Sequence, residues 1–154
     1  MNDFGSITKP DEAAMRAANV NPATGLATDY LNLFNEYIML AEMVSEGMME
    51  IGVLRYWHPI DYEAHFAQSG FTGLEVVLAA YRSLGGEAKR EFEDAVNRMI
   101  DLILVHQNRS VGAPDTIAQI KHQRDHIATL INDPVHTTDM DNSETQAGID
   151  ALFD

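Results

Sequence analysis

The sequence has 154 residues, of which 45% are hydrophobic and 22% are charged, so we expect one folded domain with a hydrophobic core. The formal net charge is −14, which disfavours nucleic acid and anionic membranes as partners because both are themselves negative. The absence of cysteine excludes disulfides, thiolate metal sites and a cysteine nucleophile.

Neither end of the sequence predicts a membrane or secretory segment. The first residues lack a basic region followed by an apolar core, and no apolar run reaches membrane-spanning length. We therefore expect a cytoplasmic protein without membrane insertion.

Local composition divides the chain into three parts. Residues 1–25 combine turn-forming residues with scattered apolar ones, which predicts a flexible N-terminal segment. Residues 26–133 carry helical periodicity that ends at a proline, and we assign them to a helical bundle domain. Residues 134–154 form an acidic, polar tail that ends in a short apolar peptide.

The first long helix is predicted from Thr28 or Asp29, either of which can cap it, to about Leu54. Gly47 and Gly52 weaken the second half of this prediction, since each costs about 1 kcal/mol relative to alanine inside a helix. The apolar positions recur at spacings of three and four: Tyr30, Leu33, Phe34, Tyr37, Ile38, Ala41 and Met48.

Four further helices are predicted at 60–68, 72–84, 87–107 and from Pro114 to about residue 132. No useful alternation of the β type is present. The sequence therefore predicts an all-α bundle of four principal helices and one short one. An apolar stripe predicts a buried face without specifying what covers it. A second copy of the chain could cover part of these stripes, so a homodimer is possible.

Four of the eight methionines lie in or near the first long helix. Methionine is a flexible filler of irregular cores and also an adaptable residue at partner-binding surfaces. We interpret this cluster, at Met39, Met43, Met48 and Met49, as core filling, with a partner groove as the alternative.

The end of the sequence carries a small amphipathic peptide. Ile149, Leu152 and Phe153 stand at i, i+3 and i+4, so one helical turn would present a single apolar edge beside Asp150. The alternative is a terminus that docks back on its own domain or frays. The whole candidate partner-binding set is Gln146, Ile149, Asp150, Ala151, Leu152 and Phe153.

This peptide, T-Q-A-G-I-D-A-L-F, resembles the S-Q-A-E-I-D-A-L-L peptide with which the flagellar switch protein FliM binds the chemotaxis regulator CheY. It is similar, more loosely, to the C-terminal peptide of CheZ-type chemotaxis phosphatases. The resemblance covers only this end of the chain. It implies a CheY-type response regulator as the partner and a role in chemotaxis or flagellar signalling.

Asp115 and Gln119 form a D-x-x-x-Q pair one helical turn apart, and this pair resembles the active-site motif of CheZ. The resemblance implies that the acid engages the regulator's site and that the amide orients the water that attacks the aspartyl-phosphate. No intrinsic cofactor is implied, because the regulator supplies the Mg²⁺. The alternative is that Asp115 only complements the helix dipole after Pro114.

His122 and His126 are the one histidine pair at i, i+4, a spacing that can hold one metal ion. Further ligands would have to come from Glu63 and His65, or from His58 or His106. The regular ligand pattern of di-iron bundles is absent, so we interpret the pair as exposed polar residues and predict no metal site.

A polar patch early in the first long helix, Asp29, Asn32, Asn35 and Glu36, is interpreted as a solvated face. Glycine loops for phosphates or dinucleotides and a serine-hydrolase elbow are absent. Three hypotheses remain: a regulator-binding protein with phosphatase activity, a non-enzymatic adaptor that joins a regulator to a motor or kinase component, and a metal-binding bundle.

Overall fold

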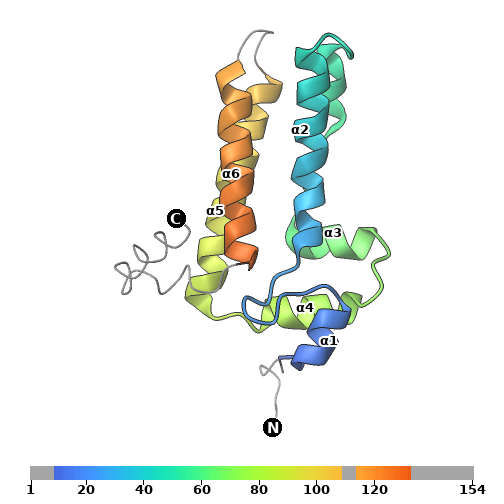
Figure 1. The fold of residues 1–154 in the computed structure, drawn as a ribbon, viewed down its shortest axis with the longest axis vertical. Coiled ribbons are helices and arrows are strands. Elements are labelled where there is room, and N and C mark those ends of the chain that lie inside the picture. The colour runs from blue at the N-terminus through green and yellow to red at the C-terminus, as the bar shows by residue number, and fades with distance from the viewer. Residues whose placement is uncertain (1–8, 109–113, 133–154) are drawn as a thin grey trace, which may run out of the picture.

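The computed structural model describes residues 9–108 and 114–132, and these ranges are all-α, as the hydrophobic periodicity predicts. Three long helices stand side by side: α2 (Leu31–Ser45), α5 (Gly86–Gln107) and α6 (Pro114–Asn132). α6 packs against both α5 and α2. Two shorter helices, α3 (Tyr62–Gln68) and α4 (Leu74–Arg82), cross one end of the bundle, which we call the foot (Figure 1).

The predicted helix boundaries of the second half of the chain are confirmed to within a few residues. α4 and α5 are separated at the predicted glycine pair, and α6 begins at Pro114. α4 lies across the foot of the bundle instead of alongside the three long helices (Figure 1). None of the described helices is both long enough and apolar enough to cross a lipid bilayer.

The prediction of one helix from residue 28 to 54 is wrong at both ends. The chain enters α2 through a short 3₁₀ turn, η1 (Thr28–Tyr30), and no side chain caps either element. α2 ends at Ser45, because Gly47 adopts a left-handed conformation with φ of +79°. The amide of Met48 then donates to the carbonyl of Met43 at 2.8 Å. This bond provides a donor for one of the last carbonyls of the helix, which have no partner within the helix itself.

Residues 9–27 are packed on the foot, whereas their composition suggested a flexible segment. Asp11 caps helix α1 (Glu12–Ala17) by accepting from the amide of Ala14 at 2.8 Å. Met15 and Val20 are buried in the common core. The scattered apolar residues of this segment therefore have a structural role, and the bundle domain begins well before residue 26.

Close packing of this segment requires a glycine in the loop before α4. Gly73 has a φ of +91°, and a Cβ added there would lie 3.0 Å from the Cβ of Ala18. A larger residue at Gly73 would be strained by its backbone angle and would also push against the segment that follows α1. This contact fixes α1 against α4.

The segment between α2 and α3 is tied into the bundle by buried polar groups. It contains a second 3₁₀ element, η2 (Ile51–Tyr56), followed by Trp57. The indole of Trp57 donates to the carbonyl of Leu33 in α2 at 2.8 Å. The side-chain amide of Gln107 in α5 donates to the carbonyls of Leu54 and Trp57 at 2.8 and 3.0 Å. These bonds hold an irregular segment in place without leaving its buried carbonyls unsatisfied.

Candidate functional site

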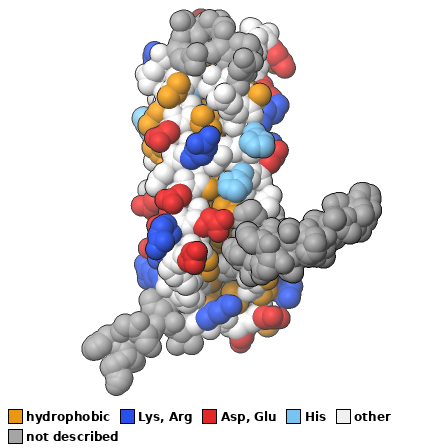
Figure 2. Space-filling model, turned by 90° about the vertical axis from the view of Figure 1, so that its left-hand side faces the viewer, with side chains coloured by type: hydrophobic (Ala, Val, Ile, Leu, Met, Phe, Trp, Pro, Cys, Tyr) orange, Lys and Arg blue, Asp and Glu red, His pale blue; other side chains and the backbone are white. Residues whose placement is uncertain are grey.

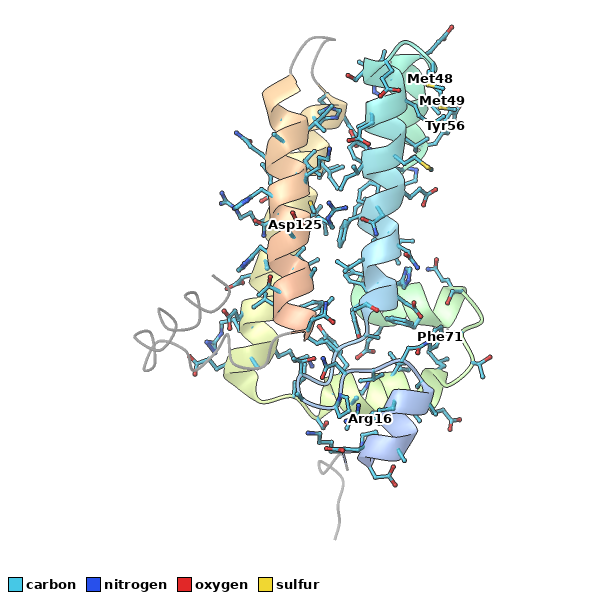
Figure 3. The ribbon with its side chains drawn as sticks, viewed as in Figure 1. Arg16, Met48, Met49, Tyr56, Phe71 and Asp125 are labelled. Carbon is cyan, nitrogen blue, oxygen red and sulfur yellow. The ribbon has the colours of Figure 1, made fainter. Side chains whose placement is uncertain are left out.

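The outer face of α6 carries Gln119 and His122, two of the polar residues that the sequence singles out. Gln119, His122 and Asp125 are exposed, whereas Ile120, Ile127 and Ile131 on the other side of the helix are buried. The face in Figure 2 mixes acidic and basic side chains, and histidines lie among them. Asp125 projects from the front of α6 in Figure 3. The side chains of Gln119, His122 and Asp125 are therefore accessible to solvent.

The backbone of α6 places Asp115 and Gln119 one turn apart, because both lie within the same continuous helix. The Gln119 side chain is exposed. The side chain of Asp115 lies outside the described residues. The acid–amide pair therefore stays a prediction. The structure describes only one of its two side chains, the accessible amide of Gln119.

The seam between α6 and α2 is held by charged and polar side chains. Lys121 forms an ion pair with Glu42, and the guanidinium of Arg124 donates to the Asn35 side chain at 2.7 Å. Asn35 belongs to the polar patch that was predicted to be a solvated face. Asn32, another member of that patch, is exposed. Part of that patch thus positions α6 on α2.

The predicted partner-binding peptide, Gln146, Ile149, Asp150, Ala151, Leu152 and Phe153, lies outside the described residues. The described chain ends in the last turn of α6, where the hydroxyl of Thr24 donates to the carbonyl of Ile131 at 2.6 Å. The end of α6 is consequently held at the foot of the bundle by this hydrogen bond.

The weak metal candidates are not brought together with further ligands. Among the residues that the structure describes, no group of three or more His, Asp or Glu side chains could hold a metal ion. His122 is exposed, and His126 is half-buried. Glu63 forms a bidentate ion pair with Arg82 at 2.9 and 3.1 Å, and the Nδ1 atom of His106 lies 2.6 Å from the hydroxyl of Tyr37. His106 is half-buried.

The interpretation of the methionine cluster as core filling is wrong for three of its members. Met39, Met48 and Met49 are 54%, 64% and 37% exposed, and Tyr56 nearby is 81% exposed. Met48, Met49 and Tyr56 gather at the end of the bundle opposite the foot (Figure 3), and we call them the distal patch. For Met48 and Met49 the cause is the left-handed turn at Gly47, which carries them off the buried face of α2, whereas Met39 lies within α2 on its exposed side.

A small cleft opens where η1, α3, α4 and α5 meet, and sequence reasoning missed it. We call it the tyrosine cleft. Its volume is about 240 Å³. Its buried aromatic members come from four separate elements, so no local motif could have revealed them. The lining residues are Tyr30, Pro59, Ile60, Asp61, Tyr62, Tyr81, Phe92, Glu93, Val96, Asn97 and Ile100.

His65 lies against the rings of Tyr30 and Phe66, and its partial burial makes the free energy of unfolding sensitive to acid. Burial lowers the pKa of its imidazole, and the backbone and carboxylate of Asp29 offset part of that effect. The folded state therefore favours neutral His65. This contribution is present above a pH of about 6.5, the ordinary value for histidine, and is lost as the pH falls through the lower folded pKa.

We expect wild-type protein to lose stability relative to His65→Gln between about pH 7 and pH 5, because glutamine does not titrate. Urea unfolding of both proteins across this range measures the difference. His58→Gln serves as the control, because His58 is exposed. A difference between wild type and His65→Gln that does not change with pH would contradict the prediction.

These features define a class: an all-α bundle with a buried aromatic core, an accessible polar face on α6 and an exposed apolar patch at one end. Comparison of the chain with protein-family models, with curated proteins and with solved structures found no match. The function must consequently be inferred from the residues themselves.

Proposed function

We propose that this protein binds a CheY-type response regulator through its terminal peptide and acts in cytoplasmic chemotaxis or flagellar signalling. The observation that carries the proposal is the sequence T-Q-A-G-I-D-A-L-F at residues 145–153. In a helical turn its apolar residues Ile149, Leu152 and Phe153 would share one edge, which a groove on the partner would bury.

The helical body would act on the captured regulator as a phosphatase. Support comes from the exposed Gln119 side chain and from its position one turn after Asp115 in α6. An amide in this position can orient a water molecule for attack on an aspartyl-phosphate, while the acid engages the regulator's site and the regulator supplies the Mg²⁺. Tethering by the tail would raise the local concentration of the regulator at this helix.

A second candidate function is favoured by the distal patch. Met48, Met49 and Tyr56 expose flexible apolar surface of the kind that binds protein partners. In this case the protein is a non-enzymatic adaptor, in which the tail recruits the regulator and the distal patch contacts a motor or kinase component. Both candidates share the tail-dependent binding step, so this step is tested first.

The test is a titration of the full chain and of a Leu152→Ala/Phe153→Ala variant against CheY-type regulators, with and without a phosphoryl mimic. Fully burying an apolar side chain is worth about 1.5–3 kcal/mol, so removing two is expected to weaken binding by at least about 100-fold. Isothermal titration calorimetry measures the affinity.

Thr145→Ala is the matched control, because Thr145 lies in the same peptide outside the apolar edge and its loss should change the affinity little. Equal affinity of the wild type and the double variant, or no binding by the wild type, would refute the proposed function.

A further inference from the structure

The outward face of α2 is apolar where a solvated helix would carry polar side chains. Met39 and Met43 stand at i and i+4, so they lie one above the other, on the side of α2 opposite the buried Tyr37 and Ala41. Met39 is exposed and Met43 is half-buried. These two side chains therefore form an apolar stripe along the outside of the bundle.

The distal patch continues this stripe beyond the end of α2. The amide of Met48 donates to the carbonyl of Met43, so the turn at Gly47 keeps the two methionines close together. The side chains of the distal patch gather at this same end of the molecule (Figure 3). The stripe and the distal patch together are called the methionine face: Met39, Met43, Met48, Met49 and Tyr56.

Acidic side chains flank the methionine face. Glu36 and Glu46 follow the outward side of α2 before and after its two methionines, and Glu50 comes directly after Met49. All three acids are exposed, and within residues 9–108 and 114–132 no ion pair engages any of them. The sequence has no lysine or arginine between residues 17 and 54, and the next basic residue, Arg55, is exposed. The charge along the outside of α2 is therefore negative.

This charge discriminates among the candidate occupants of the methionine face. The chain's own tail, residues 133–154, contains acids and no lysine or arginine, and a second copy of the chain carries the same net charge of −14. Both would bring like charge to an acidic rim, which costs free energy. A partner with basic side chains is attracted by the same rim.

We infer that the methionine face binds a basic amphipathic helix of a partner protein, with apolar side chains on the methionines and basic ones beside Glu36, Glu46 and Glu50. Methionine side chains are unbranched and polarizable, so they adapt to apolar groups of different shape. A helix presents such groups in a line, which matches a stripe that runs along α2. The inference rests on the second candidate function, the adaptor, and states the chemistry of the partner that the distal patch would contact.

The test titrates the full chain with a synthetic peptide of about five helical turns, in which leucines share one face and lysines cover the other. One control peptide has the same composition in an order that gives the leucines no common face, and the other has glutamate in place of lysine. NMR follows the methyl groups of the methionines. We expect saturable shifts at the four methionines of the face and none at the buried Met15 and Met99. Binding of either control peptide as tight as that of the amphipathic basic peptide would overturn the inference.

Met39→Ser tests the apolar part of the face. It should weaken peptide binding about tenfold, because an apolar side chain that the peptide would bury is lost. Val105→Ser is the matched control, because Val105 is 52% exposed on α5, close to the 54% of Met39, and does not belong to the methionine face. Equal losses in the two variants would overturn the inference.

Arg55→Gln tests the charged part, and here a gain of affinity is expected. Removing the cation next to Tyr56 should tighten peptide binding by about twofold to fivefold, the usual size of a surface charge interaction. Arg98→Gln is the control, because it makes the same change of net charge at an exposed position of α5. Salt screens charges farther apart than about 8 Å, so only a charge beside the peptide should matter. No gain for Arg55→Gln over Arg98→Gln would overturn the inference.

The other occupants are tested before any peptide is added. Signals of the face that move on dilution would assign the face to a second copy, and signals that move in Leu152→Ala/Phe153→Ala would assign it to the tail. Either result would overturn the inference, and constant signals are expected. No regulator is present in these measurements, so loss of peptide binding and loss of regulator binding are separate results.

Discussion

Replacing Trp57 with alanine is expected to lower the free energy of unfolding by about 3–5 kcal/mol, the usual cost of truncating a buried large aromatic side chain. Trp57 is 5% exposed and packs against Tyr37 with ring centroids 5.4 Å apart. Its indole also donates to the carbonyl of Leu33. The substitution would open a cavity between α2 and the segment that follows η2, and remove a bond that joins them. Urea unfolding followed by circular dichroism measures the change.

Tyr56 supplies the control for Trp57, since the two aromatic residues are adjacent but one is exposed and the other buried. Tyr56 is 81% exposed, so Tyr56→Ala should change stability by no more than about 0.5 kcal/mol. Trp57→Phe should cost less than Trp57→Ala, because it keeps most of the ring and loses the indole donor. Similar costs for Trp57→Ala and Tyr56→Ala would contradict the placement of Trp57 in the core.

Replacing Gln119 with alanine is expected to slow dephosphorylation of the regulator by roughly two orders of magnitude, if the body is a phosphatase. The reason is that correct positioning of the attacking water supplies most of the acceleration in this kind of reaction. Gln119 is exposed on a regular helix, so the substitution removes the amide without disturbing the core. The measurement is the decay of phosphorylated regulator at a saturating concentration of the protein.

Thr129→Ala on the same helix is the control, because Thr129 is also exposed and lies more than two turns away. Tail-dependent binding should persist in both variants. An unchanged dephosphorylation rate in Gln119→Ala, together with intact binding, would reject the phosphatase and leave the adaptor. Substitution of Met48 and Met49 by serine would then test whether the distal patch holds the second partner.

The distal patch and the tyrosine cleft lie on different parts of the molecule and have opposite chemistry. The distal patch is apolar and flexible, as suits an interface with another protein. The tyrosine cleft combines buried aromatic rings with two exposed carboxylates, those of Asp61 and Glu93.

The sequence by itself determined the all-α class and most helix boundaries after residue 60. The signals there are strong and local: α5 begins at a glycine pair, with Gly85 before its first residue Gly86, and Pro114 begins α6. Ile120, Ile127 and Ile131 recur at helical spacing in the sequence, and they form the buried side of α6. The terminal peptide and the pair of Asp115 and Gln119 are visible from the sequence alone, because both are local patterns.

Only the tertiary structure decided which apolar residues are buried and which polar residues meet. Met15 and Met48 look alike in sequence, yet the first is 1% exposed and the second 64%. The difference arises because α1 packs on α4, whereas the turn at Gly47 carries Met48 into solvent. The tyrosine cleft likewise joins Tyr30 to Glu93 across more than sixty positions of the chain. Burial and long-range contacts depend on how the helices pack, and helical periodicity specifies a buried face without specifying what covers it.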